Sequence, residues 1–367
     1  MNEDQITSRF NRQIILEEIG KEGQTQLLNS HVLVVGAGGL GCPLILYLAA
    51  AGIGKISIVD GDLISEENLH RQILFGYDDI GRNKAVVAAE KIKKLYPVAQ
   101  VQYHEEFLDK NTAFSRIEKA DIVVDGSDNF ETRYLVSDAG VILGKPLVSG
   151  SIHKFEGQVS IFNDPPGLGP TYRCLYPFAP GKDAPPPCSV SGVIGPLPGV
   201  VGSVMAMETI KVLAGIKNRL SGTLLLINLL SHNYNKIKLD PDLKNYRGPK
   251  SWEEFLGYDY SSFCGTSSGE KIEVLHFENL NSVKGSYALI DVREEGEIPE
   301  IESGKVMRFP LSKILAGQIP EINSDNAIFF CQSGIRSGQA LEKLSGKLKA
   351  RMFALKEGAK KLQSLLG

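Results

Sequence analysis

The chain has 367 residues and a formal net charge of −3, and 43% of its residues are hydrophobic. This length is too great for one ordinary core and predicts two domains, while the near-neutral charge argues against a nucleic-acid partner. We expect no membrane contact, because no apolar run approaches the roughly 18 residues that span a bilayer and the N-terminus, MNEDQITSRF, lacks the apolar stretch of a signal peptide. The five cysteines do not suggest a disulfide framework, so we expect a cytoplasmic protein with free thiols.

A nucleotide-binding pattern occupies residues 31–60. Its parts, in chain order, are an apolar strand (32–35), four glycines (Gly36, Gly38, Gly39 and Gly41), an apolar helical pattern (44–51), a second strand (56–59) and Asp60. This order is typical of a βαβ unit that binds a nucleotide. The glycines let backbone N–H groups approach a phosphate, the helix N-terminus attracts its charge, and Asp60 can hold a ribose hydroxyl. The alternative is a glycine turn that serves only helix–strand packing.

Polar residues beyond this unit favour ATP over a dinucleotide. They are Asp62, Asn68, Arg71, Gln72, Lys84 and, after a buried strand at 122–124, Asp128 and Asn129. Arg71 and Lys84 can neutralise the charge that builds up on phosphates during transfer, and Asp128 can hold Mg²⁺. A nicotinamide site has little use for this set. Taken singly, each has an ordinary alternative: a surface charge, a helix-terminal lysine, and the N-cap of a helix that starts at Phe130.

Several motifs resemble the ThiF/MoeB family, which comprises adenylating enzymes related to the ubiquitin-activating enzymes. They are GAGGLGCPLILYLAAAGIGKISIVDGD, NLHRQ, IGRNK and DGSDNFETRY, and the likeness extends over residues 8–240. The resemblance implies an α/β, Rossmann-like adenylation domain with a mixed sheet. It also implies that Mg-ATP adenylates the C-terminal glycine of a ubiquitin-like sulfur carrier ending in Gly-Gly. In this family pattern Asp60 binds ribose, Arg71 and Lys84 contact the phosphates, and Arg12 reaches the neighbouring subunit's site, which implies a homodimer.

A second α/β pattern follows a polar, turn-rich stretch. We therefore expect domains at 1–245 and 271–367 with a linker at 246–270. Strands at 286–292 and 327–330 precede a loop and then a helix at 338–349; the loop consists of Cys331, Gln332, Ser333, Gly334, Ile335, Arg336 and Ser337. A cysteine between a strand end and a helix N-terminus, with Arg336 nearby, favours the reactive thiolate. The alternative is a buried free cysteine.

This loop resembles the active-site loop of the rhodanese family, and Asp291-Val292-Arg293 resembles its Asp-x-Arg. Cys331 is then expected to carry sulfur as a persulfide. The family's Gly-His-Ile-Pro-Gly-Ala segment is absent, and the chain reads PEIESGK at 299–305. We expect the fold to be kept and the entrance to the site to be changed.

The remaining cysteines bear on metal and on carrier capture. Many family members hold a structural zinc with two Cys-x-x-Cys pairs, of which only Cys174 survives here, while Cys264 stands alone. Because tetrahedral zinc needs four ligands, we expect none. Cys188 follows a Pro-rich run, and the matching cysteine in relatives is a candidate to capture the carrier; the alternative is an incidental loop cysteine. Cys42 is expected to serve packing.

Together these patterns predict a two-step enzyme, an adenylyltransferase and sulfurtransferase that leaves its carrier with a thiocarboxylate. The expected sulfur donor is a protein such as a cysteine desulfurase. The pathway stays open, because the resemblance is compatible with the molybdopterin, thiamine, tRNA-thiolation and cysteine-forming routes. Two different readings stay open: an NAD-dependent oxidoreductase with a regulatory rhodanese tail, and a carrier-binding scaffold without activity.

Overall fold

The computed structural model describes residues 3–179, 192–264, 273–301, 306–332, 334–345, 347–356 and 358–366. The chain divides into two compact units, Met1–Cys264 and Gly265–Gly367. The expected linker region therefore overlaps the first unit. Its helices α10 (Trp252–Gly257) and α11 (Tyr260–Phe263) contact the helices of that unit, with Phe255 and Tyr260 buried.

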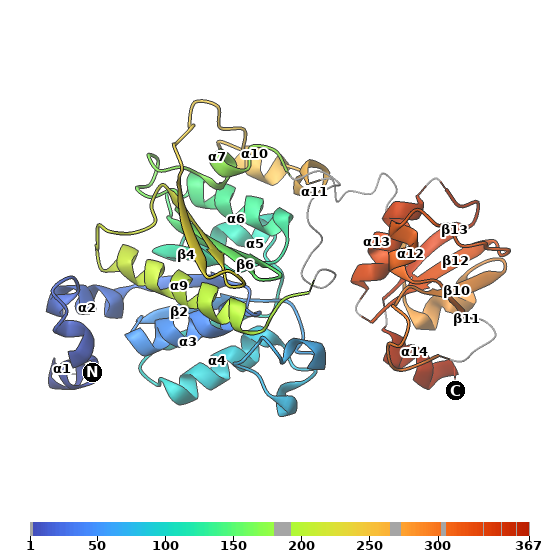
Figure 1. The fold of residues 1–367 in the computed structure, drawn as a ribbon, viewed down its shortest axis with the longest axis horizontal. Helices are drawn as coiled ribbons and strands as arrows, with labels where there is room; N and C mark the ends of the chain where they lie inside the picture. Colours follow the sequence, from blue (N-terminus) through green and yellow to red (C-terminus); the bar gives the residue numbers. More distant parts are fainter. Residues whose placement is uncertain are drawn as a thin grey trace. The chain divides into compact units, whose positions relative to one another are not determined.

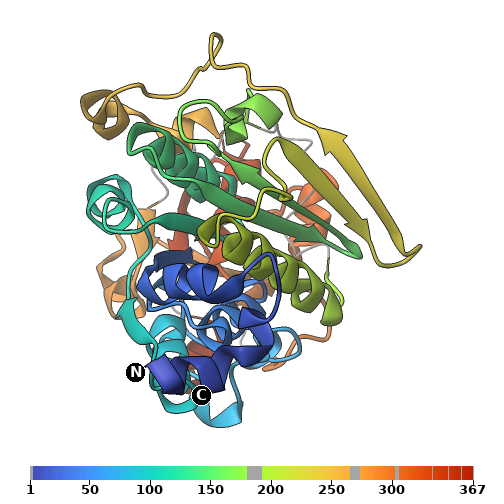
Figure 2. The same ribbon diagram turned by 90° about the vertical axis from the view of Figure 1, so that its left-hand side faces the viewer.

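The first unit is built on one mixed sheet of eight strands (Figure 1). Its strands are β1 (His31–Val35), β2 (Lys55–Val59), β3 (Gln100–His104), β4 (Ile122–Asp125), β5 (Leu147–His153), β6 (Glu156–Phe162), β7 (Thr223–Asn228) and β8 (Asn233–Lys238). They lie in the order β3-β2-β1-β4-β5-β6-β7-β8. The first five strands of that order run parallel, and the last three are antiparallel. The predicted Rossmann-like fold with a mixed sheet is confirmed, and Figure 2 shows the β7–β8 hairpin at the sheet's edge.

Helices cover both faces of this sheet. The helices are α1 (Glu3–Ile14), α2 (Gly20–Asn29), α3 (Gly41–Ala51), α4 (Lys84–Leu95), α5 (Lys110–Ile117), α6 (Phe130–Ile142), α7 (Tyr172–Leu175) and α9 (Pro196–Leu213), together with α10 and α11. One hydrophobic core lies under α3, α4 and α9, and a second lies under α5, α6, α7, α10 and α11. Because β1 and β4 are buried on both faces, they read as continuous apolar runs rather than alternating ones.

Helix α9 corrects one expectation from the sequence. Its 18 residues are long and apolar enough to cross a membrane by length and composition. The helix instead packs against α3, β5 and β6, with Leu197, Val201 and Met205 fully buried. Its buried side chains belong to the core under α3, α4 and α9.

The second unit is a five-stranded parallel sheet in the order β11-β10-β12-β13-β9. Its elements are β9 (Glu273–Leu275), β10 (Tyr287–Asp291), β11 (Val306–Arg308), α12 (Leu311–Leu315), β12 (Asn326–Phe330), α13 (Ile335–Leu344), β13 (Arg351–Leu355) and α14 (Ala359–Leu366). The expected helix at 338–349 is wrong at both ends. Gly334, at φ +85°, occupies the N-cap, so α13 starts at Ile335. The helix ends at Leu344, and Ser345 is its C-cap.

Candidate active site

Three loops of the first unit start at one edge of the sheet. In the parallel register Val35 pairs with Val59 on one side and with Asp125 on the other. The next residues along the three strands are Gly36, Asp60 and Gly126. In an open α/β sheet ligands bind at the carboxyl ends of the strands, so the fold gathers the glycine loop, Asp60 and the segment before Asp128 where a nucleotide would bind.

The glycine loop allows no side chains at its closest points. Gly36 has φ +90°, and a Cβ there would lie 3.1 Å from the carbonyl oxygen of Gly126. A Cβ on Gly41 would lie 2.1 Å from the carbonyl oxygen of Gly36. Helix α3 starts at Gly41, so its positive dipole end is available to a phosphate.

Arg71 and Gln72 lie beside this loop. A Cβ on Gly39 would be 3.7 Å from Cγ of Arg71, and one on Gly38 would be 3.8 Å from Nε2 of Gln72. Arg71 donates through Nη2 to Oδ1 of Asn68 at 2.5 Å. Gln72 is buried, and its Oε1 accepts no hydrogen bond from the described residues. A buried polar atom of this kind fits a polar ligand at the loop.

The carboxylate of Asp60 holds the glycine loop by accepting backbone hydrogen bonds. Its Oδ2 accepts the N–H of Ala37 at 2.7 Å, and its Oδ1 accepts the N–H of Asp62 at 2.8 Å. Burial raises the pKa of the Asp60 carboxyl, and the charge of Lys84 and the two backbone N–H bonds oppose that shift. Each carboxylate oxygen keeps a second acceptor position that a ribose hydroxyl can use.

Lys84 is the first residue of α4 and is buried at the same edge. Its Nζ contacts Oδ2 of Asp62 at 2.8 Å. Asn83, which the sequence analysis did not single out, caps α4 and donates to the carbonyl oxygens of Asp60 (3.0 Å) and Asp62 (3.2 Å). An asparagine directly before a predicted helix was the signal that could have revealed it.

The segment that carries Asp128 and Asn129 lies against the glycine loop through Gly126. Asn129, not Asp128, caps α6, because its Oδ1 accepts the N–H of Thr132 at 2.9 Å. The alternative of Asp128 as an N-cap is therefore wrong, and its carboxylate stays exposed. Arg133 donates to the carbonyl oxygen of Ser127 at 2.9 Å and fixes this segment from α6.

Arg12 lies away from the glycine loop of its own chain. The neighbouring Gln13 donates to the carbonyl oxygen of Ala51, at the C-terminal end of α3, at 3.1 Å. The loop is at the other end of that helix, about 16 Å away at 1.5 Å per residue. The exposed Arg12 is thus not brought to the nucleotide edge of its own subunit.

In the second unit Cys331 directly follows β12 and is fully buried. The N–H of Gly334 donates to Sγ of Cys331 at 3.0 Å, and Oγ of Ser337 lies 3.8 Å from the same sulfur. The loop thus holds the sulfur with a backbone donor near the N-terminus of α13, as its sequence suggests. Ser333 of this loop lies outside the described residues, as does Cys188.

Two arginines around this loop are held by carboxylates. Arg293, fully buried, donates from Nη2 to Oδ2 of Asp291 at 2.6 Å and to the carbonyl oxygen of Pro299 at 2.9 Å. Arg336 donates from Nη2 to Oε2 of Glu297 at 2.9 Å, and its Nη1 donates to the other carboxylate oxygen. The sequence analysis did not anticipate Glu297.

Three further cysteines are free. Burial raises the pKa of Cys42 to about 12, in agreement with a packing role, and burial also raises that of Cys264 to about 12. Cys174 accepts the backbone N–H groups of Thr171 and Asp242, each at 3.3 Å. Across the described ranges no three His, Cys, Asp or Glu side chains gather as metal ligands.

Beside Cys174 a buried cluster ties three chain segments together. Arg173 binds Asp138 of α6 with Nε at 2.8 Å and Nη2 at 2.7 Å. The hydroxyls of Tyr246 and Tyr260 donate to the same carboxylate at 2.8 and 2.9 Å. The Arg173 guanidinium also lies 4.5 Å from the ring centroid of Phe263. We call Asp138, Arg173, Tyr246 and Tyr260 the arginine staple.

Arg173→Met should lower the free energy of unfolding by about 3–5 kcal/mol, because it leaves the buried Asp138 without its cation. Arg247→Met is the matched control, since Arg247 also lies over a ring, Phe178 at 4.5 Å, but is exposed. Urea denaturation followed by circular dichroism measures both. Equal losses in the two variants would contradict the role of the arginine staple.

The expectation of no structural zinc has its own test. A zinc chelator should leave the melting temperature unchanged, and a melting temperature that falls when the chelator is added would contradict that expectation.

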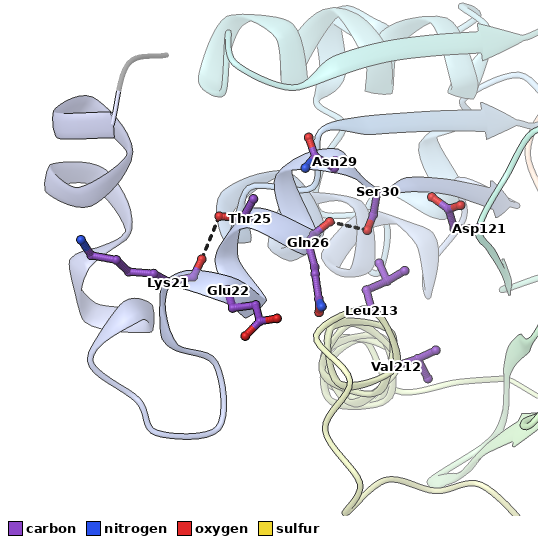
Figure 3. Close-up of a pocket in the computed structure, with 9 residues that line it drawn as sticks. All are labelled: Lys21, Glu22, Thr25, Gln26, Asn29, Ser30, Asp121, Val212 and Leu213. Carbon is purple, nitrogen blue, oxygen red and sulfur yellow. Dashed lines mark hydrogen bonds between the residues drawn. The ribbon is translucent and has the colours of Figure 1, made fainter.

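A groove of about 870 Å³ lies elsewhere on the first unit, between α2 and the end of α9 (Figure 3). Its lining includes Ser30 and Asp121, which precede β1 and β4. It therefore lies at the amino ends of the strands, opposite the glycine loop. It is not part of the candidate active site.

Comparisons with known proteins show the class of enzyme to which the chain is similar. A sulfur carrier protein adenylyltransferase of Thermus thermophilus is 45% identical over 263 residues, which span 70% of this chain and 96% of that relative. A probable adenylyltransferase/sulfurtransferase, MoeZ, of Mycobacterium tuberculosis is 40% identical over 316 residues, spanning 84% of this chain and 80% of its own. The second match covers more of the chain than the first unit alone. The chain is thus an adenylyltransferase joined to a sulfurtransferase.

The family model for the ThiF family matches residues 10–248. The chain belongs to the ThiF family, and the resemblance of its motifs to that family is confirmed. The crystal structure of Escherichia coli MccB with MccA-N7isoASN has the same fold, with a TM-score of 0.57 over 64% of this chain and 72% of that one, at 21% identity.

Proposed function

We propose that this protein uses ATP to adenylate the C-terminal glycine of a ubiquitin-like sulfur carrier and then converts that carboxylate into a thiocarboxylate. The observation that carries the proposal is the meeting of the glycine loop, Arg71 and the Asp62–Lys84 pair at one edge of a ThiF-family sheet. The T. thermophilus relative, whose name states that it adenylates a sulfur carrier protein, supports the choice of substrate.

In the first step a carboxylate oxygen of the carrier attacks the α-phosphorus of ATP. The bond from that phosphorus to the bridging oxygen breaks, and pyrophosphate leaves with the electron pair. The backbone N–H groups of Gly38, Gly39 and Gly41 receive the phosphates, and Arg71 and Lys84 neutralise the charge that accumulates on them. The N–H of Gly36 donates to the carbonyl oxygen of Val59 at 2.9 Å, so Gly36 shapes the loop instead. Asp60 and the neighbouring Asp62, Asn68, Gln72 and Asn129 complete the nucleotide site.

Asp128 is our proposed Mg²⁺ ligand. Its exposed carboxylate belongs to a segment that packs on the glycine loop, and carboxylates are the ligands that Mg²⁺ prefers beside substrate phosphates. When bound, Mg²⁺ would stabilise negative charge on the phosphate oxygens. Lys84, which Asp62 positions, would offset the negative charge of the phosphates from the other side of the glycine loop.

In the second step the terminal sulfur of a Cys331 persulfide attacks the acyl carbon and AMP leaves. The product is an acyl disulfide between the carrier and Cys331. A second thiol, for which Cys188 is our candidate, attacks the Cys331 sulfur, forms a disulfide with it and releases the thiocarboxylate. Two external thiols, or one dithiol, must then reduce that disulfide and leave as a disulfide themselves. A rhodanese-like role for the second unit rests on the N–H of Gly334 that donates to Sγ.

The donor of the persulfide sulfur is, in our proposal, a protein such as a cysteine desulfurase. We assign the reaction to the cytoplasm, because Cys331 must remain a thiol between turnovers and a reducing compartment keeps it so.

Isotope exchange between pyrophosphate and ATP tests the first step. We expect exchange only when a carrier ending in Gly-Gly is present, and none with a carrier that lacks its last glycine, because the acyl-adenylate cannot form. The truncated carrier is the control for non-specific exchange. Carrier-independent exchange, or turnover of a nicotinamide cofactor instead, would disprove the proposed function.

We further propose a homodimer in which Arg12 acts on the partner's site, because within one chain it lies near the far end of α3. Mixing Arg12→Ala and Lys84→Ala subunits should restore about a quarter of the sites in randomly formed dimers. Pyrophosphate exchange after subunit mixing measures this. An active monomer in sedimentation would refute it.

A further inference from the structure

The Glu297–Arg336 pair has a consequence for the substrate of the second unit. Arg336 belongs to the first turn of α13, within the loop that holds Cys331. Glu297 receives both terminal nitrogens of its guanidinium, so the fork that could grip an oxyanion is already occupied. Burial alone would raise the pKa of Glu297, but the hydrogen bond from Arg336 and further donors lower it overall, so this carboxylate stays charged at neutral pH.

Other cations near this segment are paired as well. Lys313 contacts Glu295 at 3.3 Å, and Arg308 contacts Glu300 at 3.5 Å. Glu294 accepts the N–H of Ser312 at 3.1 Å and adds a further negative charge. In the described part of the segment 294–300, a small anion would therefore meet four carboxylates, which repel it.

The sulfur itself is held by weaker means. The described contacts of Sγ are the N–H of Gly334 and the hydroxyl of Ser337, beside the N-terminus of α13. A backbone N–H and a helix dipole suffice for the single charge of a persulfide. A dianion such as thiosulfate needs in addition a free cation for its sulfonate end, so these groups bind it poorly.

The same segment presents an exposed apolar side chain that a protein partner could contact. Ile298, next to Glu297, is 82% exposed. An exposed apolar side chain flanked by carboxylates suits a macromolecular partner better than a small ion.

We propose that Glu297 determines the substrate class of this site: by holding Arg336 it disfavours small sulfur-bearing dianions and favours a persulfide presented by a protein. The inference rests on the proposed function of Cys331. With a protein donor, the Cys331 thiolate attacks the terminal sulfur of the persulfide, the donor's sulfur–sulfur bond breaks, and the donor cysteine leaves as a thiolate. With thiosulfate the leaving group would be sulfite.

Glu297→Gln tests this, because it removes the negative charge that holds Arg336 and one of its two acceptor oxygens without changing the size of the side chain. We expect the KM for thiosulfate, measured as sulfur transfer to cyanide, to fall about tenfold, since a charge-assisted hydrogen bond becomes available. Transfer from a cysteine desulfurase supplied with cysteine should stay within about twofold, because it does not use Arg336 as an anion site. Glu295→Gln is the matched control, since it removes the same charge and frees Lys313 outside the loop.

Three outcomes overturn the inference: an unchanged KM for thiosulfate, an equal fall in Glu295→Gln, or a parallel loss with both donors, which would make Glu297 a positioning residue. Circular dichroism of both variants confirms that each is folded. Failure of the proposed function is distinct, because then Cys331 of the unmodified protein would take sulfur from neither donor in mass spectrometry of its peptide.

Discussion

Cys331→Ala should abolish thiocarboxylate formation and sulfur transfer to cyanide while leaving pyrophosphate exchange intact. The reason is chemical: without Sγ no persulfide forms on residue 331, whereas in the proposed mechanism adenylation uses only residues of the first unit. Alanine fits the site, because Cys331 is fully buried and its Cβ is retained. Mass spectrometry of the carrier's C-terminus measures the product.

Cys264→Ala is the control for loss of a cysteine as such. Its thiol has a raised pKa and lies in the other unit, so its removal should leave both steps unchanged. A normal yield of thiocarboxylate from Cys331→Ala would refute the role assigned to that sulfur. Cys188→Ala should show a third pattern, with exchange and transfer to cyanide kept and thiocarboxylate formation slowed.

Lys84→Ala and Asp128→Asn should each lower pyrophosphate exchange by about 100–1000-fold, the usual cost of one lost electrostatic contact in a transition state. In the proposed mechanism Lys84 supplies a cation at the phosphates, and Asp128 supplies the carboxylate for Mg²⁺. For Asp128→Asn the apparent affinity for Mg²⁺ should fall as well, which titration of the exchange rate with MgCl₂ measures.

Two variants elsewhere in the first unit serve as controls. Lys94→Ala removes an exposed lysine from the last turn of the same helix α4, and Asp78→Asn removes an exposed carboxylate outside the site. Both should keep full exchange. Unchanged exchange in Asp128→Asn would remove that residue from the mechanism.

The sequence was sufficient where local pattern and buried environment agree. The strands expected at 32–35, 56–59, 122–124 and 327–330 lie within one residue of β1, β2, β4 and β12, because strands buried on both faces are continuous apolar runs. The glycine loop was also readable, since its spacing is dictated by the approach of Gly36 to Gly126 and of Gly41 to Gly36.

Contacts between segments that are distant in the sequence could not be predicted from it. Asp138 and Arg173 are 35 positions apart, and each looked ordinary within its own segment. Glu297 and Arg336 are 39 positions apart. Their pairing depends on β10 and β12 lying side by side, which brings the segments after these strands together. The start of α13 was missed because Gly334 reads as a turn residue, whereas its left-handed backbone starts the helix.

The arginine staple has a consequence for an enzyme that handles reactive sulfur. Its four side chains contain no sulfur, so a persulfide or another sulfane donor finds no thiolate there to modify. A joint built from zinc and cysteine thiolates would offer the same reagents four nucleophiles and could lose its metal to them. The buried bonds from Asp138 to Arg173, Tyr246 and Tyr260 use oxygen and nitrogen atoms, and sulfur enters this joint only through the contact of Cys174 with the N–H of Asp242. The protein thereby separates most of the integrity of its adenylation unit from the chemistry of its own product.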